Sequence, residues 1–425
     1  MNRRQFLFRT GAATTAASVN VITSSALGNG ARAAASDRIV MGAIGVGGMG
    51  RHDLGNFLTH DDTQIVAVCD VDASRLTFAK EMVDKHYENT DCAAYADFHQ
   101  LLARDDIDAV LIATPDHWHA YLSIAAAYAK KDIYCEKPIS LTISEGRIVA
   151  DAMKELGRVY QSGTQRRSIP CFRYAVDAAR AGKVGKIHTI KTYLEKGREI
   201  GPQPEQEVPE GFDYEVWLGQ APWQPYTQKR CHTFFRWIYD YSGGQLTDIG
   251  AHFNDLAQWG NDSEMTGPIS YEGSARFPKE DDLFNTPVDF QLTAKYASGV
   301  TLEIHDKSPR SVTFIGDEGW ISVNDDGVLD ADPKSLLSDF KGDAQSYSFM
   351  TPHQRNFLDA VKSRGTTIAP SEVAHRSTTV CHAANICLRL GRKLEWDPAA
   401  ERFKNDDEAN SMLEREARVP WGIHA

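Results

Sequence analysis

The sequence of 425 residues lacks the features of several protein classes. It contains no uninterrupted apolar run of about 18 or more residues, the length that a membrane-spanning helix needs, so we predict no membrane span. It also lacks an excess of basic residues, because 46 lysines and arginines stand against 58 aspartates and glutamates and the net charge is −12. Duplex nucleic acids and anionic membrane surfaces both attract basic faces, so we expect neither as a partner.

Cysteine is scarce as well, with seven residues and no Cys-x-x-Cys pair. Their spacing is too wide for a disulfide framework, and we predict that most of them are buried thiols. Hydrophobic residues make up 42% of the chain and charged residues 24%, a composition that excludes disordered and collagen-like chains. At about 150 residues per domain, the roughly 390 residues that follow position 35 predict two domains.

Residues 1–35 have the pattern of a twin-arginine export signal. Arg3 and Arg4 precede an apolar pair, a weakly apolar stretch follows over 11–27, and small residues allow cleavage near Ala33. The alternative is a disordered basic N-terminus. Because this export route carries folded proteins, the signal predicts a periplasmic or otherwise exported protein that acquires any cofactor before it leaves the cytoplasm.

Residues 36–163 alternate between strand-like and helix-like segments. Short β-branched or apolar runs predict strands at 38–44, 64–69, 109–113 and 132–135. Helices are predicted at 51–58, 74–86, 120–129 and 144–156. Because strands that alternate with helices form βαβ units, we predict an N-terminal α/β domain with a doubly wound parallel sheet.

Residues 164–425 have a different pattern. Several strand-like runs follow one another without helices between them, at 269–276, 288–296, 300–305, 311–315 and 320–323. A further strand is predicted at 187–195, and helices are predicted at 174–181, 353–362 and 372–390. Strands in series indicate antiparallel pairing, so we predict a C-terminal α/β domain with a mostly antiparallel sheet.

The clearest motif is Gly45-x-Gly47-x-x-Gly50, which lies between a predicted strand and a predicted helix. In dinucleotide-binding folds the first glycine makes the tight turn, the second lets the backbone approach the pyrophosphate, and the third lets helix and strand pack closely. Asp70 lies twenty residues beyond Gly50, where its carboxylate would accept hydrogen bonds from both ribose hydroxyls. From this motif we predict cofactor contacts by Gly45, Gly47, Gly48, Met49, Gly50 and Asp70.

The carboxylate of Asp70 also bears on which dinucleotide is bound. A 2′-phosphate would be repelled by this carboxylate, so the motif favours NAD as the cofactor. Arg75 lies close to Asp70 in the sequence and keeps NADP as the alternative.

Two further motifs follow the third and fourth predicted strands of this domain. They read Thr-Pro-Asp-His-Trp-His over 114–119 and Glu-Lys-Pro over 136–138. The carboxyl ends of parallel strands share one edge of the sheet, where ligands bind. We therefore predict that this edge presents to the cofactor Thr114, Pro115, His119, Glu136 and Lys137. Histidines two positions apart could ligate a metal, but we favour packing or hydrogen bonding beside the nicotinamide for His119 and predict no metal site.

A third motif places Asp248, His252 and Asp255 four and three positions apart. On a helix these side chains share one face, and the apolar residues between them can face the core. Removal of a hydride from a carbinol needs a base for the hydroxyl proton, and the pKa of histidine suits that task. The alternative is a histidine that the carboxylates of its own helix hold for stability.

Together these motifs resemble those of the Gfo/Idh/MocA oxidoreductase family over nearly all of the chain after residue 35. The resemblance rests on the glycine motif, on Thr-Pro-x-x-x-His ending in His119, on Glu-Lys-Pro at 136–138 and on Asp-x-Gly-x-His at 248–252. It implies a Rossmann domain joined to an α/β domain that binds substrate. It also implies that subunits pair through an open sheet of this second domain, giving a homo-oligomer, either a dimer or a tetramer.

The resemblance also assigns roles to a catalytic group. It implies that His252 accepts the proton, that Lys137 hydrogen-bonds the reacting oxygen, and that Asp248 orients and polarises. Family members commonly oxidise ring hydroxyls of sugars or inositols. The expected activity is therefore NAD-dependent oxidation of a ring hydroxyl of a sugar, glycoside or cyclitol, and the export signal adds the expectation of a tightly held cofactor.

Two other functions remain open. A redox-neutral glycosidase or lyase would oxidise a sugar transiently, break a bond by elimination or hydrolysis, and then reduce the product on the same NAD. A non-catalytic sensor of sugar or cofactor is the other, and the intact group of Lys137, Asp248 and His252 argues against it.

The stretch 200–240 departs from smaller family members by its density of proline and aromatic residues. In and just after it lie Trp217, Trp223, Trp237, Tyr239 and Tyr241. Sugar faces stack on aromatic rings, and the nearby arginines that could bind hydroxyls or a carboxylate are Arg166, Arg167 and Arg236. The alternative is an extended surface loop with ordinary aromatic anchors.

Overall fold

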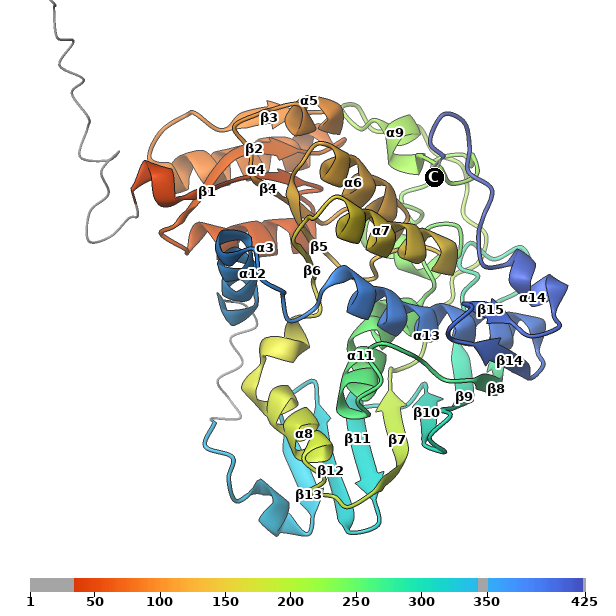
Figure 1. Cartoon of the computed structure of the whole chain (residues 1–425). Helices are drawn as coiled ribbons and strands as arrows, with labels where there is room; N and C mark the ends of the chain where they lie inside the picture. The colour runs from red at the N-terminus through yellow and green to blue at the C-terminus, as the bar shows by residue number, and fades with distance from the viewer. Residues whose placement is uncertain (1–33, 343–350, 423–425) are drawn as a thin grey trace, which may run out of the picture. The chain divides into compact units, whose positions relative to one another are not determined.

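The computed structural model describes residues 34–342 and 351–422 of the chain (Figure 1). The chain divides into two units, residues 1–38 and 39–425. In the first unit the described residues include a short 3-10 helix, η1 (Ala35–Asp37). Arg3 and Arg4 of the predicted export signal lie outside the described residues. The elements that follow belong to the second unit.

The N-terminal sheet has six parallel strands in the order β3-β2-β1-β4-β5-β6. Its strands are β1 (Ile39–Ile44), β2 (Thr63–Cys69), β3 (Ala93–Tyr95), β4 (Ala109–Ile112), β5 (Asp132–Cys135) and β6 (Tyr160–Ser162). The helices are α3 (Gly48–Leu58), α4 (Ala73–Tyr87), α5 (Phe98–Leu102), α6 (Asp116–Tyr128) and α7 (Ile143–Glu155). This is the strand order of a Rossmann domain, which confirms the predicted fold class.

Strands β3 and β6 were not predicted, because segments of three residues carry too little periodicity. A helix from far along the chain also completes this domain. Helix α12 (Thr351–Ser363) packs beside α3, and Phe357 joins the hydrophobic cluster of the sheet through edge-on contacts with Phe57 and Tyr134. Gln354 of α12 is thereby brought to Asp53 of α3.

The second sheet has nine strands in the order β13-β12-β11-β7-β10-β9-β8-β14-β15. They are β7 (Ile187–Tyr193), β8 (Ser270–Arg276), β9 (Asp289–Lys295), β10 (Thr301–His305), β11 (Ser311–Gly316), β12 (Gly319–Asn324), β13 (Leu329–Asp332), β14 (Leu394–Asp397) and β15 (Arg402–Phe403). Neighbouring strands pair antiparallel except β7 and β10, which pair parallel. The prediction of a mostly antiparallel sheet is therefore confirmed.

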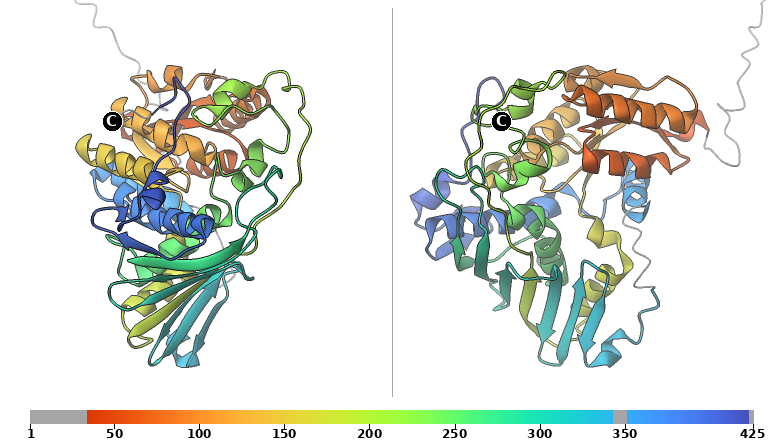
Figure 2. Two further views of the ribbon diagram at one scale, coloured as in Figure 1. Left: turned by 90° about the vertical axis from the view of Figure 1, so that its right-hand side faces the viewer. Right: turned by 180° about the vertical axis from the view of Figure 1, so that it is seen from behind.

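Helices cover one face of this second sheet. They are α8 (Pro170–Arg180), α11 (Gly250–Gly260) and α13 (Ser371–Leu390), and Figure 2 shows them on the side of the sheet nearer the Rossmann domain. Buried and half-buried residues alternate along β10, where Leu302 and Ile304 enter the core and Glu303 belongs to the opposite face. The remaining short elements are η2 (Gln165–Ser168), α9 (Tyr214–Leu218), η3 (His232–Trp237), α10 (Gln245–Asp248), η4 (Lys334–Leu337) and α14 (Asp407–Ser411).

The segment 194–244, here called the cover segment, leaves the second sheet and crosses to the Rossmann domain (Figures 1 and 2). It forms its own aromatic cluster, which includes Trp217, Trp237 and Tyr241. Backbone hydrogen bonds join it to the start of α4, from Ala73 N–H to the carbonyl of Gly211 at 2.9 Å and from the N–H of Asp213 to the carbonyl of Val71 at 2.9 Å. Most of the aromatic residues noted in the sequence thus anchor this segment, whereas Trp223 is 60% exposed.

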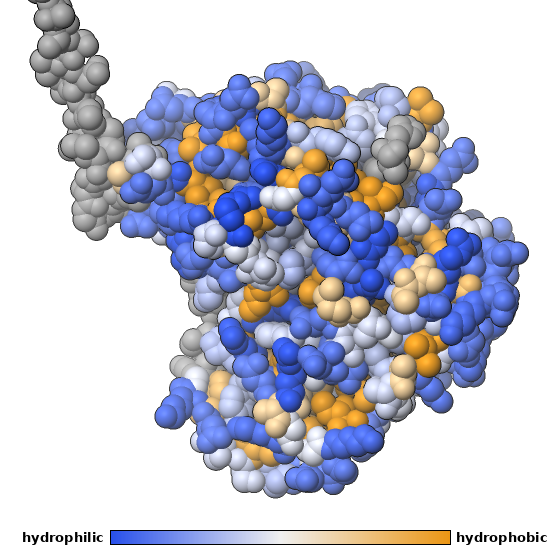
Figure 3. Space-filling model, in the orientation of Figure 1, coloured by the Kyte–Doolittle hydropathy of each residue, from blue (hydrophilic) through white to orange (hydrophobic). Residues whose placement is uncertain are grey.

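All seven cysteines are buried and unpaired, as predicted. Among the residues that the structure describes, no helix is both long and apolar enough to cross a membrane. On the face drawn in Figure 3, hydrophobic residues occur in small separate groups among hydrophilic ones.

Candidate active site

The turn between β1 and α3 has the geometry that the glycine motif predicts. Gly45 has a φ of +80°, and a Cβ there would lie 2.6 Å from the backbone nitrogen of Thr114. A Cβ on Gly50 would lie 2.0 Å from the carbonyl oxygen of Gly45, so this position needs glycine for the helix to approach the strand. A Cβ on Gly48 would meet nothing within 4 Å, and no side chain caps the N-terminus of α3. The turn is therefore open to an anionic group, which the helix N-terminus favours.

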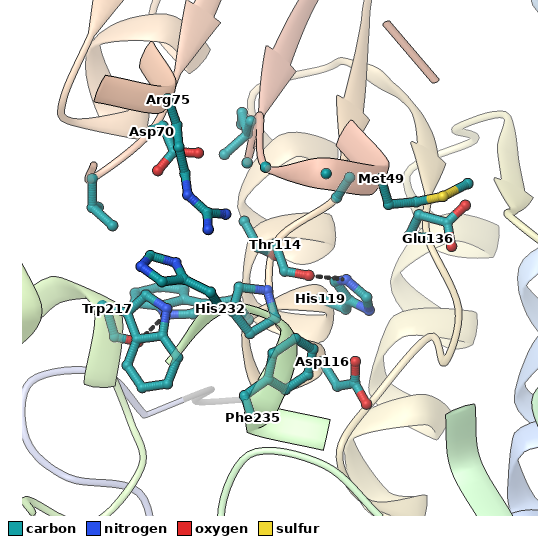
Figure 4. Close-up of a pocket in the computed structure, with 18 of the residues that line it drawn as sticks. Met49, Asp70, Arg75, Thr114, Asp116, His119, Glu136, Trp217, His232 and Phe235 are labelled. Carbon is teal, nitrogen blue, oxygen red and sulfur yellow. Dashed lines mark hydrogen bonds between the residues drawn. The ribbon is translucent and has the colours of Figure 1, made fainter. Parts of the chain in front are cut away.

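Asp70 lies at the end of β2 and faces the same cavity. Its carboxylate accepts hydrogen bonds from the backbone N–H groups of Val46 at 2.8 Å and Asp72 at 3.0 Å, which fix its orientation. Burial raises the pKa of Asp70, and the two backbone donors act in the opposite direction. Arg75 extends across the turn, because a Cβ on Gly47 would lie 2.4 Å from its Nη1. Figure 4 shows Asp70 and Arg75 together at one end of the cavity.

A cavity of about 300 Å³ connects these residues, within the size range of ligand sites. The Rossmann domain contributes to its lining Gly45, Gly47, Gly48, Met49, Asp70, Thr114, Pro115, His119, Glu136 and Lys137. The cover segment contributes Phe212, Val216, Trp217, His232, Thr233, Phe235 and Arg236. Of the cofactor contacts predicted from the sequence, only Gly50 is not part of this lining, and its role is in packing.

Lys137 and Asp248 form an ion pair beside the cavity. The Lys137 ammonium donates to Asp248 Oδ1 at 2.5 Å and to the backbone carbonyl of Asp248 at 3.1 Å. Arg236 Nε lies 3.4 Å from the same carboxylate oxygen. Burial alone would raise the pKa of Asp248, but the charges of Lys137 and Arg236 outweigh it and hold the pKa well below its usual range. Asp248 therefore stays ionised and keeps the ammonium group oriented.

His252 lies in the first turn of α11 and faces the cavity. Burial, together with the positive charges of Arg166 and Lys137, lowers its pKa well below its usual value. The imidazole is therefore neutral near pH 7 and able to accept a proton. Within the described residues, His252 Nδ1 and Thr114 Oγ1 are buried on this cavity without a hydrogen-bond partner. Buried polar atoms are usually paired, so these two fit a site that a polar ligand completes.

The two strand-end motifs are joined by His119. One ring nitrogen lies 2.6 Å from the carbonyl oxygen of Pro138, and the other lies 2.9 Å from that of Thr114. Burial lowers the pKa of His119 to about 4, so the neutral ring donates one of these hydrogen bonds. His117 contacts the carbonyl of Trp217 at 2.9 Å. In the described part of the chain, no group of three or more histidine, cysteine, aspartate or glutamate side chains has the arrangement of a metal site.

The third motif differs from the helix that its spacing predicts. The chain forms two helices, α10 and α11, with Ile249 between them. Asp255 does not join the pair of Lys137 and Asp248, because its carboxylate accepts from Arg167 at 2.6 and 2.7 Å and from Ser377 at 2.7 Å. The single polar stripe expected from spacing is therefore wrong for Asp255.

The three arginines proposed as substrate ligands do not all lie at the cavity. Arg167 is only 1% exposed, and its charge is taken by Asp255 and Glu264. Arg166 is paired with Asp325 at 2.6 Å. Of the three arginines, Arg236 is the one that lines the cavity.

Several residues of the site were missed by sequence reasoning. Asp116 lies inside a motif that was recognised, yet no role was assigned to it. Ser242 donates a hydrogen bond to Asp116 at 2.5 Å, and burial raises the pKa of Asp116 to about 7. Asp53 and Gln354, which lie behind Glu136, belong to no motif, and only the packing of α12 brings Gln354 there.

Known protein families match most of the chain. Residues 39–164 match the oxidoreductase family described as "NAD-binding Rossmann fold", and residues 192–423 match its "C-terminal alpha/beta domain". A myo-inositol 2-dehydrogenase of Thermotoga maritima is 31% identical over 333 residues, covering 76% of this chain and 86% of that protein. An inositol 2-dehydrogenase of Rubrobacter xylanophilus is 33% identical over 152 residues, which cover 35% of this chain and 42% of that protein.

Solved structures share the fold at lower identity. A WlbA dehydrogenase from Chromobacterium violaceum, solved with NADH and UDP-GlcNAcA, superposes with a TM-score of 0.66 at 18% identity, covering 85% of this chain and 96% of that one. An aldose-aldose oxidoreductase from Caulobacter crescentus gives a TM-score of 0.65 at 17% identity, covering 84% and 99%. The family matches and the Thermotoga relative together show that the chain belongs to the Gfo/Idh/MocA family of NAD-binding oxidoreductases, which act on CH–OH groups.

Proposed function

We propose that the protein oxidises a ring hydroxyl of a sugar, a glycoside or a cyclitol, and that it keeps NAD bound between turnovers. The observation that carries this proposal is that Lys137, held by Asp248, and His252 both line the cavity that also contains the glycine turn. The relatives named for inositol, and the neighbour solved with UDP-GlcNAcA, support a polyhydroxylated ring as the substrate.

Each residue of the group has a separate task on the substrate hydroxyl. Bound NAD supplies the hydride acceptor. Lys137 uses two of its hydrogen-bonding directions on Asp248 and has a third to donate to the carbinol oxygen. His252 accepts the hydroxyl proton at Nδ1, which has no partner among the described residues. Asp248 remains ionised and holds the side chain of Lys137 in its orientation.

The cover segment supports slow release of the cofactor. Figure 4 shows Trp217 and Phe235 on the side of the cavity away from Asp70, with Thr114 between them and Asp70. This segment is anchored on the Rossmann domain by the Phe212–Asp72 bridge and by hydrogen bonds from His117 and Trp118 to the carbonyl of Trp217. A dinucleotide on the glycine turn would have to displace this segment in order to leave, and residence time follows the dissociation rate.

An exported location makes such retention necessary. We propose export on the basis of Arg3 and Arg4 and the weakly apolar stretch that follows them. Outside the cytoplasmic membrane NADH would not be reoxidised by a soluble pool, so the hydride must return within the site. It would pass to a second sugar or ketone, or to the same substrate after a bond is broken.

The redox-neutral glycosidase or lyase is the second candidate, and Asp116 favours it. Elimination or hydrolysis needs a proton donor or acceptor in addition to the one that serves the hydroxyl. Asp116 lines the cavity, and its pKa of about 7 lets it give or take a proton near neutral pH. Product analysis with a glycoside separates the candidates: a released aglycone with no net NADH indicates the second.

The test of cofactor retention uses the purified protein. We expect NAD to survive purification and prolonged dialysis, and added NAD to leave the rate almost unchanged. Phe235→Ala should release the nucleotide roughly tenfold faster, which corresponds to about 1.4 kcal/mol of lost contact. Trp223→Ala is the matched control, because it removes an exposed aromatic residue of the same segment that does not line this cavity. A nucleotide-free preparation with ordinary saturation by added NAD and stoichiometric NADH release would contradict the proposal.

We also propose that subunits pair through the second sheet. The face opposite the helices carries half-exposed polar residues such as Lys191, Thr293 and Glu303. Light scattering at several concentrations would measure the resulting dimer or tetramer, and a monomer at all concentrations would contradict the pairing.

A further inference from the structure

Five polar side chains form an enclosed cluster behind the cavity wall. They come from α3, β5, the strand end after β5, η2 and α12, and are Asp53, Tyr134, Glu136, Gln165 and Gln354, all of them buried. Gln165 Nε2 donates to Glu136 Oε1 at 2.6 Å, and Gln354 Nε2 donates to Asp53 Oδ1 at 3.2 Å. The cluster therefore joins a fully buried carboxyl group, that of Asp53, to one on the cavity wall, that of Glu136.

These two carboxyl groups lack enough donors for both to be ionised. Asp53 Oδ2 is fully buried and has no N–H or hydroxyl donor among the described residues. The Asp53 and Glu136 carboxyl groups belong to one network, because the Tyr134 hydroxyl lies 3.4 Å from Nε2 of Gln165, which holds Glu136, and 3.4 Å from Nε2 of Gln354, which holds Asp53. A proton on Asp53 Oδ2, donated to Glu136, would satisfy the oxygen that otherwise has no donor. Burial, and then the negative charge of Glu136, raises the pKa of Asp53 well above its usual value.

The structure also fixes the position of Glu136. Its Oε2 accepts a hydrogen bond from the backbone N–H of Lys137 at 3.2 Å, and Gln165 holds the other oxygen. A Cβ on Gly163 would lie 2.2 Å from Oε1, so glycine there leaves just enough room for the carboxylate. The carboxyl group of Glu136 is thus locked in place from three sides.

Glu136 forms part of the cavity wall at the end opposite Asp70. Figure 4 shows Asp70 and Arg75 at one end of the cavity and Met49 with Glu136 at the other. Glu136 and Lys137 would hold the nicotinamide end of NAD, if the glycine turn held the pyrophosphate and Asp70 the adenosine ribose. The open turn at Gly48 and the unpaired Thr114 Oγ1 show that the cavity fits this placement.

We propose that Asp53 is a protonated positioning residue that donates a hydrogen bond to Glu136, and that the single negative charge left on the pair favours the oxidised over the reduced nicotinamide. The oxidised ring carries a positive charge and the reduced ring is neutral, so a fixed carboxylate beside it stabilises only the oxidised form. The cluster would then hold resting enzyme in the state that is ready to accept a hydride. This inference rests on the cofactor placement of the proposed function.

The test compares the preference of variant proteins for the two cofactor forms. Each protein is incubated with equal, saturating concentrations of NAD⁺ and NADH until the bound ratio no longer changes, so that slow exchange is complete, and the bound nucleotides are then released and quantified. Glu136→Gln removes the charge and should shift the bound ratio about tenfold toward NADH. Asp53→Asn keeps a hydrogen-bond donor and removes only the ability of this side chain to ionise. Its bound ratio should therefore stay within about twofold of that of the wild type. The twofold and tenfold limits correspond to about 0.4 and 1.4 kcal/mol.

The possible outcomes are distinct. A shift in Asp53→Asn as large as that in Glu136→Gln would show that Asp53 is ionised, and no shift in Glu136→Gln would show that the charge does not act on the nicotinamide; either result overturns the inference. A protein that binds neither nucleotide would instead contradict the proposed function.

A second measurement detects the proton on Asp53 directly. Infrared spectra of protein labelled with ¹³C at the aspartate carboxyl should show a label-sensitive carboxylic-acid C=O band that is lost in Asp53→Asn and kept in Asp116→Asn. Absence of that band would overturn the protonation of Asp53.

Discussion

Removal of the Lys137 ammonium separates the catalytic role of this residue from its structural one. In Lys137→Met, Asp248 loses its 2.5 Å partner and keeps Arg236 at 3.4 Å. Loss of one partner of a buried ion pair costs about 3–5 kcal/mol. The side chains of Lys137 and Asp248 are 12% and 15% exposed, and Arg236 retains part of the compensation. We therefore expect a loss of about 2–3 kcal/mol in unfolding free energy.

Turnover should fall much further than this destabilisation explains. A group that acts on the reacting proton or oxygen contributes about 10²–10⁴-fold, and the same loss is expected for Lys137→Met on an identified substrate while cofactor stays bound. Lys131→Met is the matched control, because Lys131 is also buried and lies just before β5, whereas Lys137 lies just after it. Its ammonium donates to the carbonyls of Arg104 at 2.6 Å and Ile107 at 2.9 Å, away from the cavity. This control should lose stability and keep its turnover number.

The assay is a double-mutant cycle of Lys137→Met and Asp248→Asn, with unfolding midpoints in urea and turnover measured on the same preparations. The double variant should be less destabilised than the sum of the single variants, because neither Lys137 nor Asp248 is left as a charge without the other. Strictly additive stabilities would refute the structural pairing. Near-wild-type turnover in folded Lys137→Met with bound nucleotide would refute the catalytic role.

Three further predictions concern single positions. His252→Ala should lower turnover by about 10²–10⁴-fold and leave nucleotide content unchanged, and a rate near that of the wild type would contradict its role as base. Asp70→Ser, with Arg75 left beside it, should improve binding of NADP relative to NAD in direct titrations, whereas a wild type that already prefers NADP would contradict the role of Asp70. The pKa of Asp116 is raised by burial to about 7, above the value of about 3.9 in an unfolded chain. The stability of the wild type relative to Asp116→Asn should therefore fall by about 1.4 kcal/mol per pH unit from pH 5 to 7, and parallel unfolding midpoints over that range would contradict the shift.

The Rossmann domain could be predicted from local pattern because its signals are local. The glycine turn needs a positive φ at Gly45 and close contact at Gly50, and few other residues meet those needs. Strands buried on both faces are continuous apolar runs, which makes β4 and β5 visible in the sequence. Because parallel strands end at one edge, the positions of Thr114 and Lys137 on the cavity also follow from strand order.

Only the tertiary structure shows which charged side chains form ion pairs. Helical spacing groups Asp255 with Asp248, yet Asp248 pairs with Lys137, and Asp255 pairs with Arg167, a residue 88 positions away. The cover segment was visible as an aromatic-rich stretch, but its closure over the cavity depends on contacts with α4 and α6 that no periodicity encodes.

The pairing of Asp53 with Glu136 could not be predicted from the sequence either. Asp53 is one of many aspartates in the sequence, and Gln354 comes from a helix 301 positions along the chain. Period and spacing report which face of one element a residue occupies, whereas protonation depends on burial and on neighbours from several elements. The sequence by itself therefore determined the cofactor class and the candidate catalytic residues, and the three-dimensional packing determined their charge states.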